Sequence, residues 1–299
     1  MVAMVGIDSV LKAMQAHGLS ADVQAHGCME LGNLASGNAA NQVAVVEKGG
    51  IEAVFKAMEE HGLSVDVQEW GCSALGRFAT CNTDNKVRIV DMGGIDAVLN
   101  AMGVHGSSAG VQTEGCGVLG ILALGNADNR VMVDIAAEGG IAAVLKAMER
   151  HESSAGVQEE GCMALGCLAS GNADNRVAIA EKGGIMAVVK AMERHRSSAD
   201  VQEWGCCALG CLAASNADNK VKIASQGGIA AVLTAMAEHE RSAGVQEGGC
   251  RALGNLASAE AEVLLRAGGA AALIRKALAA LPGRDDFQTK GKKLLMMLA

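Results

Sequence analysis

Residues 183–213 read GGIMAVVKAMERHRSSADVQEWGCCALGCLA, and near-copies of this stretch recur along the whole chain of 299 residues. The Gly-Cys pair within it returns at intervals of 44, 44, 46, 44 and 44 residues, at Cys28, Cys72, Cys116, Cys162, Cys206 and Cys250. One unit of this size cannot bury its own apolar face, so a fixed period in the forties predicts a stacked array. We therefore expect one continuous repeat domain rather than separate globules.

Each unit is predicted to contain three helices, as residues 172–215 illustrate. An Asn-rich turn at 172–175 precedes a short helix over about 176–182, and Gly183-Gly184 ends it because glycine accepts the left-handed conformation of a helix terminus. A second helix follows over about 185–194, with apolar residues at i, i+3, i+4 and i+7. Ser198 is the expected N-cap of the third and longest helix, over about 199–214. No segment alternates with period two, which favours an all-α fold.

This order of elements resembles the armadillo repeat. Its Ala-Leu-x-Asn-Ile/Leu-Ala signature is best preserved at residues 31–35 and 252–257. The resemblance covers essentially the whole chain and implies a right-handed α-solenoid of three-helix repeats with degenerate terminal caps. The units would be about 1–37, 38–81, 82–125, 126–171, 172–215, 216–258 and 259–299. Two-helix HEAT repeats have a similar period and are the structural alternative.

The two terminal units and the fourth unit depart from this pattern. The first unit opens at Gly6-Ile7 without a short first helix, and Lys292 stands near the C-terminus where other units hold the repeated cysteine. A lysine there fits a terminal unit with nothing stacked on that face. In the fourth unit, residues 131–138 carry two extra residues, which predicts a longer or bulged first helix.

Composition excludes several classes of function. The net charge of −8 and the 2% aromatic content argue against nucleic-acid binding. No apolar run is long enough to span a membrane, and residues 1–18 lack the features of a signal peptide. Cysteines in one register of stacked units would lie about 8–10 Å apart, too far for disulfides. We therefore expect buried free thiols in a reducing compartment, such as the cytoplasm.

Most residues capable of chemistry recur in every unit, so we interpret them as structural. The repeated His, Gln and Gly residues are expected to cap helices or to allow close helix packing. Cys167, Cys207 and Cys211 lack the ligand spacing of a zinc site, and no phosphate-binding loop is present. The sequence therefore predicts neither enzyme activity nor a metal or cofactor.

The positions where the units disagree are the informative ones. Three variable positions of each third helix, spaced i, i+3 and i+7, lie on one stripe. In armadillo proteins this face lines the concave groove, and the resemblance places the family's peptide-holding asparagine at Asn33 and Asn255. The remaining positions of that row are not asparagine, so the regular array of nuclear-import receptors is absent. From this stripe we expect partner contacts at Asn33, Trp70, Arg77, Met163, Trp204, Cys207, Arg251 and Asn255.

Acidic residues flank this stripe, and they have two interpretations. They lie in the first two turns of their helices, where they compensate the helix dipole, or they form an acidic lip that favours a basic partner. The residues concerned are Glu69, Glu114, Glu159, Glu160, Glu203 and Glu247.

The sequence thus predicts a non-enzymatic scaffold that binds an extended segment or a helix of a partner protein. One alternative is a structural or linker subunit buried in a larger assembly. A cofactor-binding or redox role for Cys167, Cys207 and Cys211 is the third.

Overall fold

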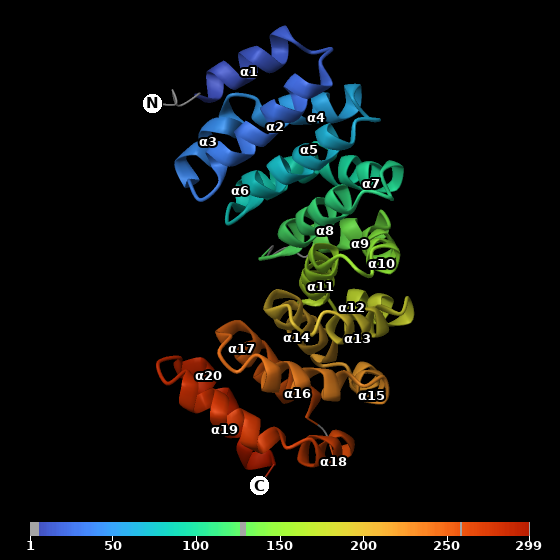
Figure 1. Cartoon of the computed structure of the whole chain (residues 1–299), viewed down its shortest axis with the longest axis vertical. Helices are drawn as coiled ribbons and strands as arrows, with labels where there is room; N and C mark the ends of the chain where they lie inside the picture. The colour runs from blue at the N-terminus through green and yellow to red at the C-terminus, as the bar shows by residue number, and fades with distance from the viewer. Residues whose placement is uncertain (1–5, 126–129, 258, 299) are drawn as a thin grey trace. The chain divides into compact units, whose positions relative to one another are not determined.

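The computed structural model describes residues 6–125, 130–257 and 259–298, which form twenty α-helices and no strand (Figure 1). They contain no helix with the length and apolarity needed to cross a membrane. The helices form two compact units, residues 1–150 and 151–299. The boundary falls in the fourth triplet, between its second and third helices.

Unit 1 begins with a helix pair and continues with helix triplets. The pair is α1 (Ile7–Ala16) and α2 (Ala21–Ala35). The following helices are α3 (Ala39–Glu47), α4 (Gly50–Glu60), α5 (Val65–Ala79), α6 (Thr83–Asp91), α7 (Gly94–Val104), α8 (Ala109–Ala123), α9 (Arg130–Ala137) and α10 (Gly140–Arg150). Within a triplet, a short first helix precedes a second helix of 11 residues and a third of 15 residues.

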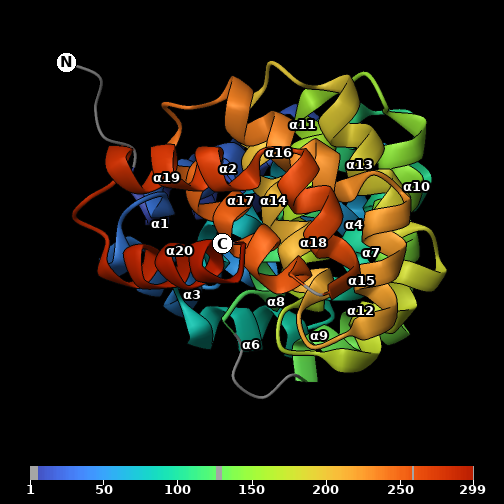
Figure 2. The same ribbon diagram turned by 90° about the horizontal axis from the view of Figure 1, so that it is seen from below.

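Unit 2 begins with a third helix and continues with two regular triplets and a terminal one. Its helices are α11 (Ala155–Ala169), α12 (Ala173–Glu181), α13 (Gly184–Arg194), α14 (Ala199–Ala213), α15 (Ala217–Ser225), α16 (Gly228–Glu238), α17 (Ala243–Leu256), α18 (Ala259–Ala267), α19 (Ala270–Ala280) and α20 (Asp285–Met297). Figures 1 and 2 show its third helices α14, α17 and α20 on one side and its first helices α12, α15 and α18 on the other.

The predicted capping signals are present, but the short first helix begins earlier than expected: α12 spans Ala173–Glu181 with Asn172 as its N-cap, so residues 173–175 are helical rather than a turn. The Ser198 hydroxyl accepts a hydrogen bond from the Val201 N–H at the start of α14, and the Asn216 side chain caps α15 in the same way. Gly183 and its counterparts end the first helices in the left-handed conformation, with φ of 85° at Gly183. These local rules fix where each helix begins and ends.

Buried amides join helices within a triplet and also link neighbouring triplets. The Gln202 side chain is 2% exposed and donates to the carbonyl oxygens of Met192 and His195, at 2.9 and 3.0 Å. The Asn219 side chain donates to Leu212 O on the preceding third helix and to Arg176 O on the preceding first helix. The repeated Gln and Asn thus satisfy helix-end carbonyls that would otherwise be buried without a partner.

The repeated histidines link neighbouring triplets. His195 and His239 are the C-caps of α13 and α16. The His195 Nε2 bonds the Glu152 carbonyl at 2.8 Å, and the His239 Nε2 bonds the Arg196 carbonyl at 2.6 Å. Because a carbonyl only accepts, each Nε2 carries the proton and donates it. This arrangement is structural and resembles no metal site.

The glycine four residues after the repeated cysteine corrects one expectation. We expected a neighbouring helix backbone to exclude a methyl group at every copy. A Cβ at Gly32, Gly166 or Gly210 would indeed lie 3.2 Å from a Cα of the next third helix, but Gly76 would meet only side chains and Gly254 faces open space. The helices therefore approach most closely at only some of the repeats.

The irregular fourth unit shows no long first helix in the described residues. Helix α9 spans eight residues, whereas its counterparts span nine. Residues 126–129, which precede it, lie outside the described residues. The expectation of a longer or bulged helix is therefore not met within α9 itself.

A strained turn yields a prediction about stability. Ser215 follows α14 with φ of 51°, whereas Gly171 occupies the same place after α11 with φ of 74°. A side chain in the left-handed region costs about 1–2 kcal/mol. Glycine avoids this cost, but its greater flexibility in the unfolded chain offsets part of the gain. We expect Ser215→Gly to raise the free energy of unfolding by about 0.5–1 kcal/mol, measured by urea denaturation.

The matched control is Ser170→Gly, because Ser170 has an ordinary φ of −69°. This control should leave stability unchanged or lower it. An equal gain from both substitutions would show that backbone strain is not the cause.

Candidate functional site

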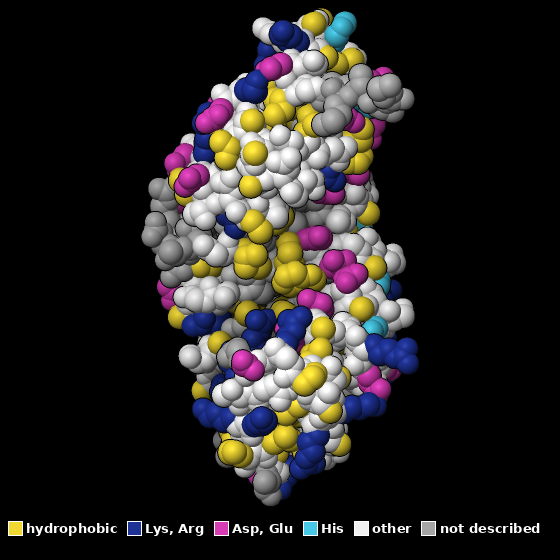
Figure 3. All heavy atoms as spheres, turned by 90° about the vertical axis from the view of Figure 1, so that its left-hand side faces the viewer, with side chains coloured by type: hydrophobic (Ala, Val, Ile, Leu, Met, Phe, Trp, Pro, Cys, Tyr) yellow, Lys and Arg dark blue, Asp and Glu magenta, His cyan; other side chains and the backbone are white. Residues whose placement is uncertain are grey.

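The third helices of each unit lie side by side and pack more extensively on one another than on any other helices. In unit 1 these are α2, α5 and α8, and in unit 2 they are α11, α14, α17 and α20. We call the solvent-facing stripe of these helices the third-helix face. Figure 3 shows one side of the molecule, on which hydrophobic side chains reach the surface and Lys and Arg gather over the C-terminal part.

In unit 1 the face holds a polar network beside a tryptophan. Trp70 and Arg77 on α5 are half-buried, and the Arg77 guanidinium donates to the side-chain oxygen of the exposed Asn33 on α2. Glu114 on α8 accepts a hydrogen bond from Ser73 and lies near Arg77. Burial raises the pKa of Glu114, while Ser73 and Arg77 act in the opposite direction. The two polar side chains beside Arg77, those of Asn33 and Glu114, therefore come from the protein itself.

In unit 2 the face holds a cavity of about 340 Å³. Trp204 and Cys207 on α14, Arg251 on α17 and Phe287 on α20 line it, together with Gly244, Gly248, Glu203, Glu247, Cys250 and Lys290. Trp204 is half-buried, so one part of its ring is held by the fold and another reaches solvent. A half-buried tryptophan at a cavity is typical of an interaction hot spot.

The remaining expected contact residues are less available. Met163 on α11 is only 9% exposed and belongs mainly to the core of unit 2. The Asn255 side chain donates to Gly210 O at 2.9 Å, so one hydrogen of its amide already bonds the neighbouring third helix.

Two of the acidic residues have a structural role. The carboxylates of Glu69 and Glu203 occupy the space that a Cβ of Gly110 or Gly244 would need, in the first turn of the next third helix. A negative charge at a helix N-terminus is favourable. Burial nevertheless raises the pKa of both carboxyls, with smaller contributions from Asp66 near Glu69 and from Asp200 and Glu247 near Glu203.

The other acidic residues are also half-buried. Burial raises the pKa of Glu159, with Asp200 and Glu203 adding to the effect. Glu247 forms an ion pair with Arg284 at 2.7 Å, and Glu160 is half-buried on α11. In unit 2 the acidic residues thus contribute little exposed negative charge to the face.

All ten cysteines are free. Burial raises the pKa of the Cys28, Cys162 and Cys250 thiols to about 12, so these thiols act as small apolar groups. Cys207 and Cys211 are half-buried, and burial raises the pKa of both. No group of three or more ligands for a metal occurs among the described residues.

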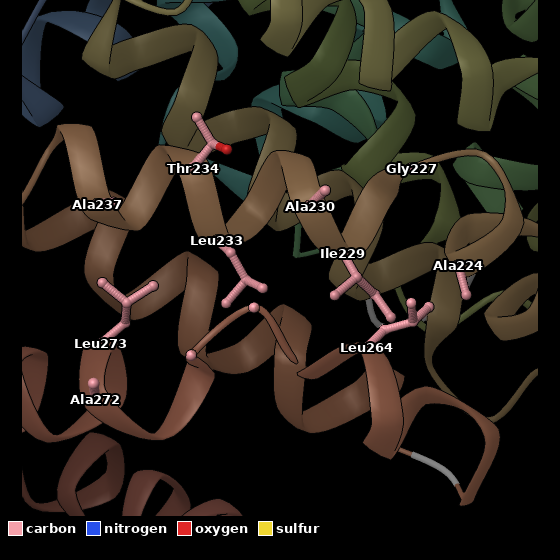
Figure 4. Close-up of a pocket in the computed structure, with 12 residues that line it drawn as sticks. Ala224, Gly227, Ile229, Ala230, Leu233, Thr234, Ala237, Leu264, Ala272 and Leu273 are labelled. Carbon is pink, nitrogen blue, oxygen red and sulfur yellow. The ribbon is translucent and has the colours of Figure 1, made fainter. Parts of the chain in front are cut away.

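A second cavity lies away from this face, between the second helices α16 and α19 (Figure 4). Its volume is about 660 Å³, and only the Thr234 hydroxyl adds a polar side-chain group to a lining of Leu, Ile, Ala and Gly. The corresponding place between α7 and α10 in unit 1 is lined by Glu138, Lys146 and Arg150. None of the residues that line this cavity belongs to a third helix.

Sequence reasoning missed two elements of the unit 2 cavity. Gly248 lines the cavity where other third helices carry His, Trp or Glu, and a Cβ at Gly248 would lie 3.3 Å from both Cys207 Sγ and Glu203 O on α14. Phe287, 8% exposed, closes the cavity from α20. The glycine in the variable row was a usable signal, because every other member of that row has a large side chain.

Comparisons with known proteins agree with this architecture. The family model described as LRRK2 ARM repeat matches residues 139–298, more than half of the chain. The chain belongs to the armadillo repeat family. The predicted fold class, an all-α armadillo solenoid, is thereby confirmed. No curated protein matches this armadillo sequence significantly.

Several solved structures share the armadillo fold. An engineered protein superposes with a TM-score of 0.78 at 24% identity, covering 98% of this chain and 68% of the other. A designed armadillo repeat protein in complex with the peptide (KR)4 gives 0.69 at 20% identity, covering 84% and 99%. A structure described by the interaction between cadherin and beta-catenin gives 0.53 at 14% identity, covering 98% and 60%. None of these comparisons indicates a catalytic family.

Proposed function

We propose that this armadillo protein is a non-enzymatic scaffold that binds a segment of a partner protein on its third-helix face. The half-buried Trp204 beside a cavity of about 340 Å³ is the observation that carries the proposal. The buried core of each unit holds this face in place, so the partner bears most of the ordering entropy. The (KR)4 peptide bound by a designed armadillo protein supports a peptide as the kind of ligand.

The expected contacts are distributed over both units. Trp70 and Trp204 act as anchors, and Arg251 provides a charged contact. Asn33 and Asn255 hold the partner backbone. Each uses the hydrogen-bonding groups of its side-chain amide that remain available beside its contact to Arg77 or to Gly210. The protein is expected to act in a reducing compartment, since its ten cysteines are free, including the exposed Cys81.

The test compares proteins retained from native extract by wild type and by a Trp70→Ala/Trp204→Ala variant. Loss of a retained protein from the double variant is the expected result. For a partner found in this way, Trp204→Ala should weaken binding by about 2 kcal/mol, the size of a hot-spot contact. Isothermal titration calorimetry measures it.

Phe55→Ala is the matched control, because Phe55 is half-buried on the second helix α4, outside the third-helix face. It should retain the partner. Unchanged binding by both tryptophan variants would remove the proposal.

A structural or linker subunit is the second candidate, and a row of exposed valines favours it. Successive first helices present Val43, Val87 and Val133 in unit 1, and Val177, Val221 and Val263 in unit 2, each between 36% and 71% exposed. A subunit that buries this row in an assembly should self-associate when isolated. Sedimentation as a stable monomer at high concentration would contradict this candidate.

A further inference from the structure

We propose that the cavity beside Trp204 selects a partner segment in which an apolar side chain is flanked by acidic residues. This inference rests on the proposed function and specifies the chemistry of the partner in unit 2. It differs from the acidic lip and basic partner that the sequence suggested. The charges at the cavity that are available to a partner determine the charge that the partner must carry.

The two carboxylates at the cavity both have contacts within the protein, although burial, Asp200 and Glu247 raise the pKa of Glu203. The Glu203 carboxylate lies against Gly244 at the N-terminus of α17, where the helix dipole favours it. Glu247 is paired with Arg284 at 2.7 Å, and 30% of its side chain is exposed. Neither carboxylate is therefore well placed to attract a basic partner residue.

The positive charge at the cavity is not compensated in this way. Arg251 is exposed and donates a hydrogen bond to the Cys207 thiol, with Cys211 also nearby. No ion pair of the described residues includes Arg251. A neutral thiol orients the guanidinium but leaves its charge available. Arg77 in unit 1 differs, because Asn33 and Glu114 already engage it.

The surroundings extend this positive charge. Residues 259–299 carry seven Lys and Arg against four Asp and Glu, although the chain as a whole has a net charge of −8. Lys and Arg also gather on the C-terminal part of the face in Figure 3. A carboxylate on the partner would form a charge-assisted, bidentate hydrogen bond with Arg251.

The shape of the site determines the second part of the motif. Trp204 and Phe287 supply aromatic surface, and Gly248 lines the cavity without adding a side chain. A cavity of about 340 Å³ accommodates one large apolar side chain. The inferred ligand is therefore an extended segment with one apolar anchor and acidic neighbours that reach Arg251.

A random peptide library displayed on phage tests this inference on the full chain. Wild type should enrich peptides with an apolar residue flanked by Asp or Glu. Arg251→Ala should weaken the binding of the enriched peptides about tenfold, which is the effect of losing one charge-assisted hydrogen bond. Arg275→Ala is the control, because Arg275 is exposed on the second helix α19, and it should leave binding unchanged.

The outcomes separate this inference from the proposed function. Wild type could instead enrich basic or uncharged peptides whose binding is lost in the Trp204→Ala variant. That result would overturn the inference and leave the scaffold function intact. Acidic peptides that bind Arg251→Ala as well as wild type would also overturn it. No enrichment over the Trp70→Ala/Trp204→Ala variant would overturn both.

Discussion

Replacing Leu209 with alanine should lower the free energy of unfolding by about 2–5 kcal/mol, the range for a fully buried leucine. Leu209 on α14 is 0% exposed. Its Cδ1 lies 3.5 Å from the place that a Cβ of Gly228 would occupy, so it also packs against the start of α16. Removing three carbons there leaves a cavity between helices of two neighbouring triplets, and rigid helices close such a space poorly.

The same substitution at Leu19 is the control. Leu19 is 99% exposed in the turn between α1 and α2, so Leu19→Ala should change stability by less than about 0.5 kcal/mol. Urea denaturation followed by circular dichroism measures both, with the slope of each transition checked for loss of cooperativity. Similar small effects at both positions would contradict the buried core described for unit 2.

Two glycines in one register should respond to the same substitution with opposite sign. A Cβ at Gly210 would lie 3.2 Å from Ala252 Cα, a backbone atom that cannot move independently of α17. We expect Gly210→Ala to lower the free energy of unfolding by about 1–3 kcal/mol through overpacking. Gly254 faces open space, so Gly254→Ala should raise it by up to about 1 kcal/mol through helix propensity.

Thermal and urea denaturation of the two single variants and the double variant measure this difference. The two sites are on different helices, but Gly210 O accepts from Asn255, so the double variant also tests whether the effects add. Destabilisation by both single variants would show that the helices are also closely packed at Gly254. Stabilisation by both would contradict the close approach of α14 and α17.

The environments of the acidic residues beside Trp204 are not visible in the sequence. In the sequence, Glu203 and Glu247 are two acidic residues near a tryptophan. In the structure, one lies at the next helix's N-terminus and the other pairs with Arg284. Net charge along a stripe therefore says little about the charge that a partner would meet.

The sequence by itself determined the fold class and, to within about three residues, the bounds of the helices in the unit 172–215. Those features depend on local chemistry: Ser198 caps α14 with its own hydroxyl, and Gly183 ends α12 because it accepts a left-handed conformation. Repetition of these signals indicated a stack, since one triplet cannot bury its apolar face. The same reasoning placed the variable stripe on the third helices.

Only the tertiary structure decided which of the repeated residues share one environment and which do not. Gly210 and Gly254 occupy identical places in the repeat, yet only Gly210 has a backbone atom of the next helix 3.2 Å away. No ion pair of the described residues includes Arg251, and residues of α14, α17 and α20 line one cavity beside Trp204, so both features depend on side chains about 40 residues away in sequence. Such contacts depend on the distances between packed helices, and a repeat pattern, which treats every copy alike, does not contain them.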